Sequence, residues 1–327
     1  MPTPPAAAPE SDEILPDWPL FGWADDVRPA LKRARTAGTP AAMVTLHTSL
    51  GGGPRPVGTQ MLFAGTQAAG FLSGGCLEAD VARHAHQTLD DGQPRHLVYG
   101  EGGPPDIRLL CGARIALLIE RIVPDDAAAG ELLSLTERRR PALWRSDGRL
   151  RWAEPAEPQT IACAVRDEPF ELTKSYAPIP RLVIVGADPT ALAIAQLGLQ
   201  AGFETHLVRP KGPAEPPPLP GLAYHRRAPA EAMAEIGLDP WTSVAVATHD
   251  WEIDQAALVA ALPSPAPYVG VLGARRRLPE RLARLAEAGV TLEQRARLRG
   301  PIGLDLGGKA PWEVAVAVVA EMVAARR

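Results

Sequence analysis

Two short stretches place a cysteine beside glycine, the pattern in this chain best suited to sulfur or metal chemistry. Ser73-Gly74-Gly75-Cys76 runs through Leu77 and Glu78 into a helical pattern, and Cys111-Gly112 directly precedes a strand pattern. If Cys76 lies in the first turn of its helix, the helix dipole and the nearby backbone amides favour its thiolate. Such a thiolate can hold a metal, carry sulfur or attack an electrophile. The alternative is a buried cysteine that packs as a small hydrophobic residue.

A second candidate site is the turn Gly186-Ala187-Asp188-Pro189-Thr190-Ala191, which follows a buried strand and opens a helix. It has the position of the glycine-rich phosphate-binding turn of a dinucleotide-binding unit, but Asp188 and Ala191 replace two glycines. The Asp188 carboxylate repels a phosphate. Arg209 ends the next strand, where an acidic residue would bind the ribose of NAD. The pattern disfavours NAD, whereas a phosphate contact of Arg209 and a domain that binds no dinucleotide both stay open.

Three further polar clusters in the second half follow strands or precede a helix. They are Thr248-His249-Asp250, Gly273-Ala274-Arg275-Arg276-Arg277 and Gly303-Leu304-Asp305-Leu306-Gly307. Open α/β sheets bind ligands at the carboxyl ends of their strands, so these clusters are candidate ligand contacts. The arginine run lies at the positive end of a predicted helix, an unfavourable place that an anionic ligand would offset. The alternative for this run is a solvated first helical turn.

Composition narrows the class of protein. The 327 residues are 46% hydrophobic, enough for packed cores and most compatible with two domains. The formal net charge of −4 gives no indication of a nucleic-acid or anionic-membrane partner. Three widely spaced cysteines do not suit a disulfide framework and favour a reducing, cytoplasmic setting. Residues 1–9 lack the features of a secretory signal, and the longest apolar run, residues 314–320, is too short to span a bilayer.

The first half mixes helices and strands without regular alternation, which predicts an α+β N-terminal domain over residues 18–166. Residues 1–17 are expected to form a disordered tail, and residues 167–180, with three prolines, a linker. The predicted helices cover residues 23–36, 77–89 and 127–138. The predicted strands cover residues 41–47, 58–63, 68–72, 97–99, 113–121 and 161–165, with a hairpin over residues 142–151 around Asp147-Gly148.

Residues 181–327 alternate strands and helices, which predicts an α/β, Rossmann-like C-terminal domain with a mostly parallel sheet. The predicted strands cover residues 182–185, 206–208, 243–247 and 268–272. The predicted helices cover residues 190–201, 255–262 and 278–288, with a last helix from Pro311. The first of these strands is a continuous β-branched apolar run, as expected for a strand buried on both faces. The proline-rich segment 210–220 is expected to be irregular.

Taken together, these motifs resemble the XdhC/CoxI family from about Trp23 to the C-terminus. The motifs that carry the resemblance are Gly53-Pro54-Arg55-Pro56-Val57-Gly58, Ser73-Gly74-Gly75-Cys76-Leu77-Glu78, Cys111-Gly112, Thr248-His249-Asp250, Tyr268-Val269-Gly270-Val271-Leu272-Gly273, Pro301-Ile302-Gly303-Leu304-Asp305-Leu306-Gly307 and Pro311-Trp312-Glu313-Val314-Ala315. The chain departs from the family pattern at several positions. Asp188-Pro189 stands where the family has a second glycine and a histidine, and Arg209 stands where it has an aspartate. Gly52-Gly53 replaces a serine pair, Ala113 a glycine and Ala310 a threonine cap.

The resemblance implies an accessory protein that is not itself an enzyme. Family members bind molybdenum cofactor, allow a cysteine desulfurase to add its terminal sulfur, and insert it into an apo xanthine dehydrogenase-type molybdoenzyme. A homodimer is a further expectation. The cargo is molybdopterin or its cytidine dinucleotide form, with Cys76 and Cys111 as candidate molybdenum or sulfur ligands. Matched motif residues and clusters supply the other expected cofactor contacts: Arg55, Gly74, Gly75, Glu78, Gly186, Asp188, Arg209, Thr248, His249, Asp250, Gly273, Arg275, Arg276 and Asp305.

Two other functions stay open. One is an NAD(P)-dependent oxidoreductase with a degenerate fingerprint, for which His249 is the candidate proton-transfer residue. The other is a catalytically inert scaffold of a dehydrogenase complex, in which Cys76 would have no chemical role. Cys163 matches no motif and is expected in the core.

Overall fold

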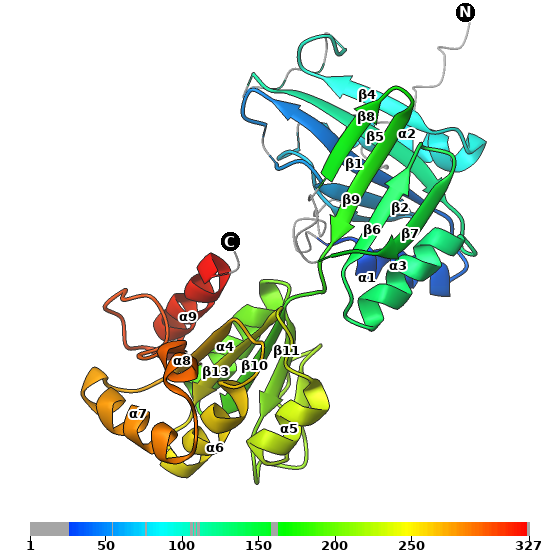
Figure 1. Cartoon of the computed structure of the whole chain (residues 1–327). Coiled ribbons are helices and arrows are strands. Elements are labelled where there is room, and N and C mark those ends of the chain that lie inside the picture. Colours follow the sequence, from blue (N-terminus) through cyan, green and yellow to red (C-terminus); the bar gives the residue numbers. More distant parts are fainter. Residues whose placement is uncertain are drawn as a thin grey trace, which may run out of the picture. The chain divides into compact units, whose positions relative to one another are not determined.

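The computed structural model describes residues 26–53, 55–75, 77–104, 107, 109, 112–157 and 163–325. The chain divides into two compact units, Met1–Pro178 and Ile179–Arg327 (Figure 1). The predicted tail, Cys76 and Cys111 lie outside the described residues. Every helix in the described part of the chain is too short or too polar to cross a lipid bilayer.

The first unit is α+β, as the sequence predicts. Its larger sheet is antiparallel, in the order β3 (Gln67–Gly70), β2 (Gln60–Ala64), β1 (Ala41–Leu50), β5 (Arg114–Ile122), β4 (Arg95–Tyr99). The smaller sheet is also antiparallel, in the order β7 (Arg151–Pro155), β6 (Ala142–Ser146), β9 (Phe170–Tyr176), β8 (Cys163–Asp167). The described helices are α1 (Arg28–Thr36), α2 (Glu78–Asp91) and α3 (Ala127–Glu137).

The larger sheet is covered on both faces, because alternate residues of its strands point to opposite sides. On β1, Ala42, Val44 and Leu46 pack against α2. Ala41 and Met43 belong to a second apolar cluster with α1, α3 and the smaller sheet. The α2 helix therefore lies on one face of the sheet, and the other two helices and the smaller sheet lie on the opposite face.

The prediction of a linker over residues 167–180 is wrong. Phe170–Tyr176 forms β9, a central strand that pairs with both β6 and β8. The buried Tyr176 hydroxyl donates a hydrogen bond of 2.9 Å to Gln60 of the larger sheet. The prolines that suggested a linker flank the strand at positions 169, 178 and 180 rather than interrupting it.

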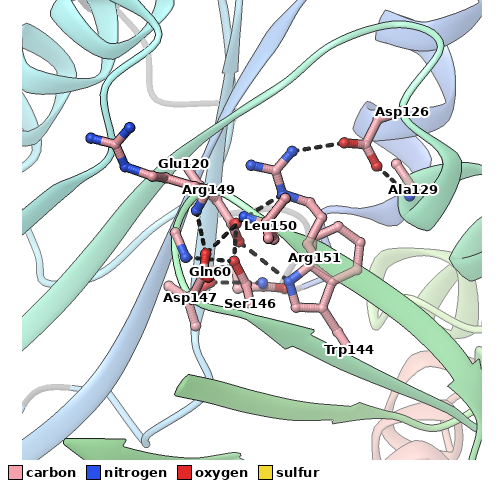
Figure 2. A network of polar contacts seen from close by, with 12 residues as sticks. Gln60, Glu120, Asp126, Ala129, Trp144, Ser146, Asp147, Arg149, Leu150 and Arg151 are labelled. Atoms are coloured by element: carbon pink, nitrogen blue, oxygen red, sulfur yellow. Dashed lines mark hydrogen bonds and ion pairs between the residues drawn. The ribbon is translucent and has the colours of Figure 1, made fainter. Parts of the chain in front are cut away.

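A buried carboxylate joins the two sheets of the first unit (Figure 2). Glu120 of β5 is fully buried and accepts hydrogen bonds from Trp144 Nε1 (3.3 Å) and Ser146 Oγ (2.5 Å) of β6. Arg151 of β7 reaches the same carboxylate at 3.1 Å and Asp126, the N-cap of α3, at 2.7 Å. The network fixes the register between the layers, because each of its members is buried or nearly so.

The second unit has a six-stranded parallel sheet, which confirms the predicted Rossmann-like α/β class. The order is β12 (Ala223–His225), β11 (Glu204–Val208), β10 (Arg181–Gly186), β13 (Thr242–Ala247), β14 (Tyr268–Val271), β15 (Leu298–Arg299). This is the doubly wound order, with a topological switch point between β10 and β13. Segment 210–220 contains neither helix nor strand, as expected from its prolines.

Helices cover both faces of this parallel sheet, which is why β10 is apolar throughout (Figure 1). Leu182 and Ile184 face α4 (Pro189–Gln200) and α9 (Pro311–Ala325). Val183 and Val185 face α5 (Pro229–Ile236), α6 (Trp251–Ala261) and α7 (Leu278–Glu287). The sequence pattern did not predict α5, α8 (Leu292–Ala296) or the short edge strands β12 and β15, whose few residues give little periodic signal.

The Glu120 network yields a stability prediction. Glu120→Ala leaves the guanidinium of Arg151 and the hydroxyl of Ser146 without their buried acceptor, so we expect a loss of about 3–5 kcal/mol in the free energy of unfolding. Denaturant titration of the full chain measures it. The matched control is Glu154→Ala, which removes a half-exposed partner of Arg145 and should cost no more than about 1 kcal/mol. Equal losses for both variants would contradict the assigned role.

Candidate functional site

The glycine-rich loop before α2 is organised by the carboxylate of Glu78. One oxygen accepts hydrogen bonds from the backbone N–H of Leu72 (3.1 Å) and of Ser73 (2.6 Å). The other accepts from the Ser73 hydroxyl (2.6 Å) and from the backbone N–H of Gly75 (3.0 Å) and of Leu77 (3.2 Å). Glu78 is 1% exposed, so the loop closes around this side chain. Glu78 therefore positions the loop.

This arrangement changes the expectation for Cys76. The α2 helix begins at Glu78 with Leu77 as its N-cap, and Cys76 itself lies outside the described residues. The loop amides that were expected to favour a thiolate donate instead to Glu78. Burial by itself raises the pKa of Glu78, but the hydrogen bonds from Ser73 and Leu72 outweigh it and lower the pKa below 4.5. The carboxylate is therefore ionised at neutral pH.

Other predicted residues of the first unit lie around the same loop. The Arg55 guanidinium stacks 4.2 Å from the ring centre of Phe71, which directly precedes the loop. Gly74 and Gly75 are exposed, and Gly75 has a φ of +110°, which favours glycine. Cys163, expected in the core, is only half-buried in β8. This partial burial raises the pKa of its thiol and makes it a poor nucleophile.

The second unit has a crevice of about 440 Å³ where β10, β11 and β13 end. It brings together six residues predicted from separate motifs, namely Gly186, Asp188, Arg209, Thr248, His249 and Asp250. Lys211 adds a second cation and has a left-handed backbone with φ of +58°, an uncommon conformation for a residue other than glycine. The convergence follows from the parallel sheet, whose strands all end at this edge.

In the turn after β10, the Asp188 side chain lies where a pyrophosphate would bind. The Asp188 carboxylate caps α4 by accepting a hydrogen bond of 2.9 Å from the backbone N–H of Ala191. Its second oxygen lies 3.2 Å from Nε2 of His249, whose side chain is 77% exposed. A Cβ on Gly186 would lie 2.5 Å from the Ala247 carbonyl, so glycine is required there for packing. The residue that replaces the second glycine thus occupies the helix N-terminus that would bind NAD phosphates.

The rim of the crevice at the end of β13 is held by an ion pair that the sequence motifs did not predict. The Thr248 hydroxyl donates a hydrogen bond of 2.5 Å to Asp254, which forms a buried ion pair of 2.9 Å with Arg281. Burial raises the pKa of Asp254 despite these partners. Asp250 caps α6 through the backbone N–H groups of residues 252 and 253. The sequence signal for this ion pair is an aspartate at the fourth position of one helix and an arginine on the next helix.

Four other predicted residues do not line the crevice. Arg275 and Asp305 form an exposed ion pair of 3.6 Å, with side chains 79% and 83% exposed. Arg276 is exposed in the short 3₁₀ turn before α7. Gly273 lines a separate, much smaller cavity beside Arg281. The arginine run therefore has the solvated position that was the alternative interpretation.

Metal binding by the cysteines stays a prediction. The described residues hold no group of three or more His, Cys, Asp or Glu side chains arranged to bind a metal. Both candidate ligands, Cys76 and Cys111, lie outside those residues.

Comparison with known proteins shows which family the chain belongs to. The sequence model of the XdhC and CoxI family matches residues 34–100, and that of the XdhC Rossmann domain matches residues 182–322. The molybdenum cofactor insertion chaperone PaoD of Escherichia coli is 30% identical over 92% of this chain and 89% of its own length. The chain belongs to the XdhC and CoxI family.

Two more distant similarities agree with this membership. A Bacillus subtilis protein named as a probable xanthine dehydrogenase subunit is 26% identical over 88% of this chain and 93% of its own length. A crystal structure described as a xanthine dehydrogenase from Bacillus halodurans shares the fold, with a TM-score of 0.72 and 23% identity over 92% of this chain and 95% of that one.

Glu78→Gln tests the loop. The amide retains one acceptor oxygen, so buried N–H groups lose their partner, which costs roughly 1–3 kcal/mol each. We expect lower stability and faster hydrogen exchange at residues 72–77. Glu101→Gln, at an exposed position of the same unit, is the control. Unchanged exchange in the loop of the Glu78 variant would contradict its positioning role.

The pKa of Glu78 also predicts a pH dependence. A carboxyl whose pKa is lowered on folding stabilises the folded state above its unfolded pKa near 4.5, and this contribution is lost as the pH falls through the lower folded value. Loop protection measured by hydrogen exchange should therefore fall as the pH drops below about 4.5. The dependence should be absent in Glu78→Gln; its persistence there would assign it to another group.

Proposed function

We propose that this protein binds molybdenum cofactor, supports its sulfuration and inserts it into an apo molybdoenzyme of the xanthine dehydrogenase type. The observation that carries the proposal is near full-length similarity to a molybdenum cofactor insertion chaperone. In this proposal the protein is a carrier without catalysis of its own, and the molybdenum cofactor is its cargo. A cysteine desulfurase and the recipient enzyme are the proposed partners, and a homodimer stays a prediction.

The crevice supports this function through its chemistry. The cargo carries a phosphate and a pterin with many hydrogen-bonding groups, and the crevice offers Arg209 and Lys211 next to Thr248 and His249. Because Asp188 caps α4, the phosphate has to be held by cationic side chains rather than by the helix N-terminus. The same feature disfavours a dinucleotide bound in the usual pose of an NAD(P)-dependent oxidoreductase.

Copurification tests the proposal. Protein isolated from cells that make the cofactor should carry a pterin, measured as its fluorescent oxidation product, and should activate an apo-dehydrogenase. A preparation that has no pterin and transfers no activity would refute the carrier function.

Arg209→Gln tests the crevice. It removes a charge-assisted contact worth about 1.5–3 kcal/mol, so pterin retention should fall by about tenfold or more. Arg227→Gln is the matched control, because Arg227 is an exposed arginine paired with Glu235 in the same unit. Arg275→Gln should leave pterin retention unchanged if the crevice alone holds the phosphate. Lower retention in this variant would show that the arginine run also contacts the cofactor.

The two matched cysteines are proposed to act on the sulfur of the cargo. Cys76→Ala and Cys111→Ala should reduce activation of the recipient enzyme and the sulfur that cyanide releases from the bound cofactor, while pterin retention persists. Cys163→Ser is the control. Full activation by the Cys76 variant would favour the inert-scaffold alternative.

A further inference from the structure

A second cavity of about 200 Å³ adjoins the crevice and shares Ala187 and Arg209 with it. Its remaining walls come from α4, β11, β12 and the proline-rich segment, through Leu192, Leu207, Pro213, Glu215, Pro216, Pro217 and Tyr224. Whole small-molecule sites usually have about 300–1,000 Å³. The smaller cavity is thus too small for a complete ligand and suits one ring of a molecule that extends into the crevice.

The proline-rich segment is fixed in place. The Tyr224 hydroxyl donates a hydrogen bond of 3.1 Å to the Pro213 carbonyl, and Nε of Arg226 donates one of 3.0 Å to the Gly212 carbonyl. Gly212 is buried, and a Cβ there would overlap the Tyr224 hydroxyl and lie 2.9 Å from Cδ of Arg209. The cavity is therefore formed by tight packing against the stem of Arg209, although its segment has no helix or strand.

The lining combines flat apolar surfaces with two opposite charges. Proline rings, a tyrosine ring and two leucines form the walls, which suits the faces of a planar ring. Arg209 lines both cavities, and Glu215 is an exposed residue of the smaller one. Neither side chain has a hydrogen-bond or ion-pair partner among the described residues. Both charges are available to a ligand.

We propose that the smaller cavity is the seat of a ring with a 2-amino-4-oxopyrimidine edge, which in the proposed function is the pterin ring of the cargo. That edge presents an N–H and an adjacent amino group, two donors that match a carboxylate in a two-bond pair with Glu215. Arg209 then meets the phosphate of the same molecule in the crevice. Cytosine offers only one donor next to an acceptor on its corresponding edge, so Glu215 discriminates against a cytidine ring. This inference rests on the proposed function for the identity of the ligand.

Metal-free probes test the ring specificity directly. GMP carries the same edge and a phosphate, neopterin carries the edge alone, and CMP carries a phosphate without the edge. By calorimetry on the full chain, GMP should bind at least about tenfold more tightly than CMP, and neopterin should compete with GMP. Glu215→Gln should abolish the preference, whereas Arg209→Gln should weaken GMP and CMP alike. CMP binding as tightly as GMP would overturn the proposal, as would an unchanged preference in Glu215→Gln.

Two variants serve as controls. Glu231→Gln removes another exposed glutamate of the same unit, from the first turn of α5, and should leave the preference for GMP intact. Leu192→Trp fills the cavity from α4 and should abolish GMP and neopterin binding, with a thermal melt to verify folding. Persistent binding by folded Leu192→Trp would place the ring elsewhere.

Copurified pterin separates this inference from the proposed function. Wild-type protein that carries pterin, together with a Glu215→Gln variant that retains it equally well, would refute the ring seat and leave the carrier function standing. A GMP preference that depends on Glu215, in a protein that never carries pterin, would support the ring seat and refute the carrier function.

Discussion

In each unit, a carboxylate occupies the backbone N–H groups that a glycine-containing turn would otherwise offer to an anion. Glu78 takes four such groups of the loop before α2, and Asp188 takes the N–H of Ala191 in the first turn of α4. Free N–H groups at a helix start are a general binding site for phosphates. Because these N–H groups are used internally, cationic side chains are the expected contacts for an anionic cargo.

This constraint accounts for the character of the crevice. Two cations, Arg209 and Lys211, stand at the end of β11 and just beyond it, where a dinucleotide-binding domain would use an acidic residue. A site that relies on flexible cationic side chains binds an anion less rigidly than a cradle of backbone amides. That property suits a carrier that must release its cargo to another protein. The buried Asp254–Arg281 pair keeps the rim at the end of β13 in place, so the crevice is shaped independently of the cargo.

The sequence predicted most of this architecture, because its strongest signals were long and periodic. The apolar run of β10 and the helix–strand alternation after it were sufficient for the parallel sheet, and the sheet then brought Asp188, Arg209 and His249 to one edge. The failures have physical causes. The prolines around β9 suggested a linker. The strand is stabilised by pairing with β6 and β8, and its own residues do not show which strands it will pair with. The roles of Glu78 and Asp188 as acceptors depend on loop geometry that residue types do not specify.

The most direct test is a crystal structure of the protein isolated with its cargo. The account predicts a pterin whose phosphate contacts the Arg209 guanidinium, with Asp188 still capping α4. A phosphate seated on the N-terminal amides of α4 with the Asp188 carboxylate displaced, or a pterin bound away from this crevice, would contradict it.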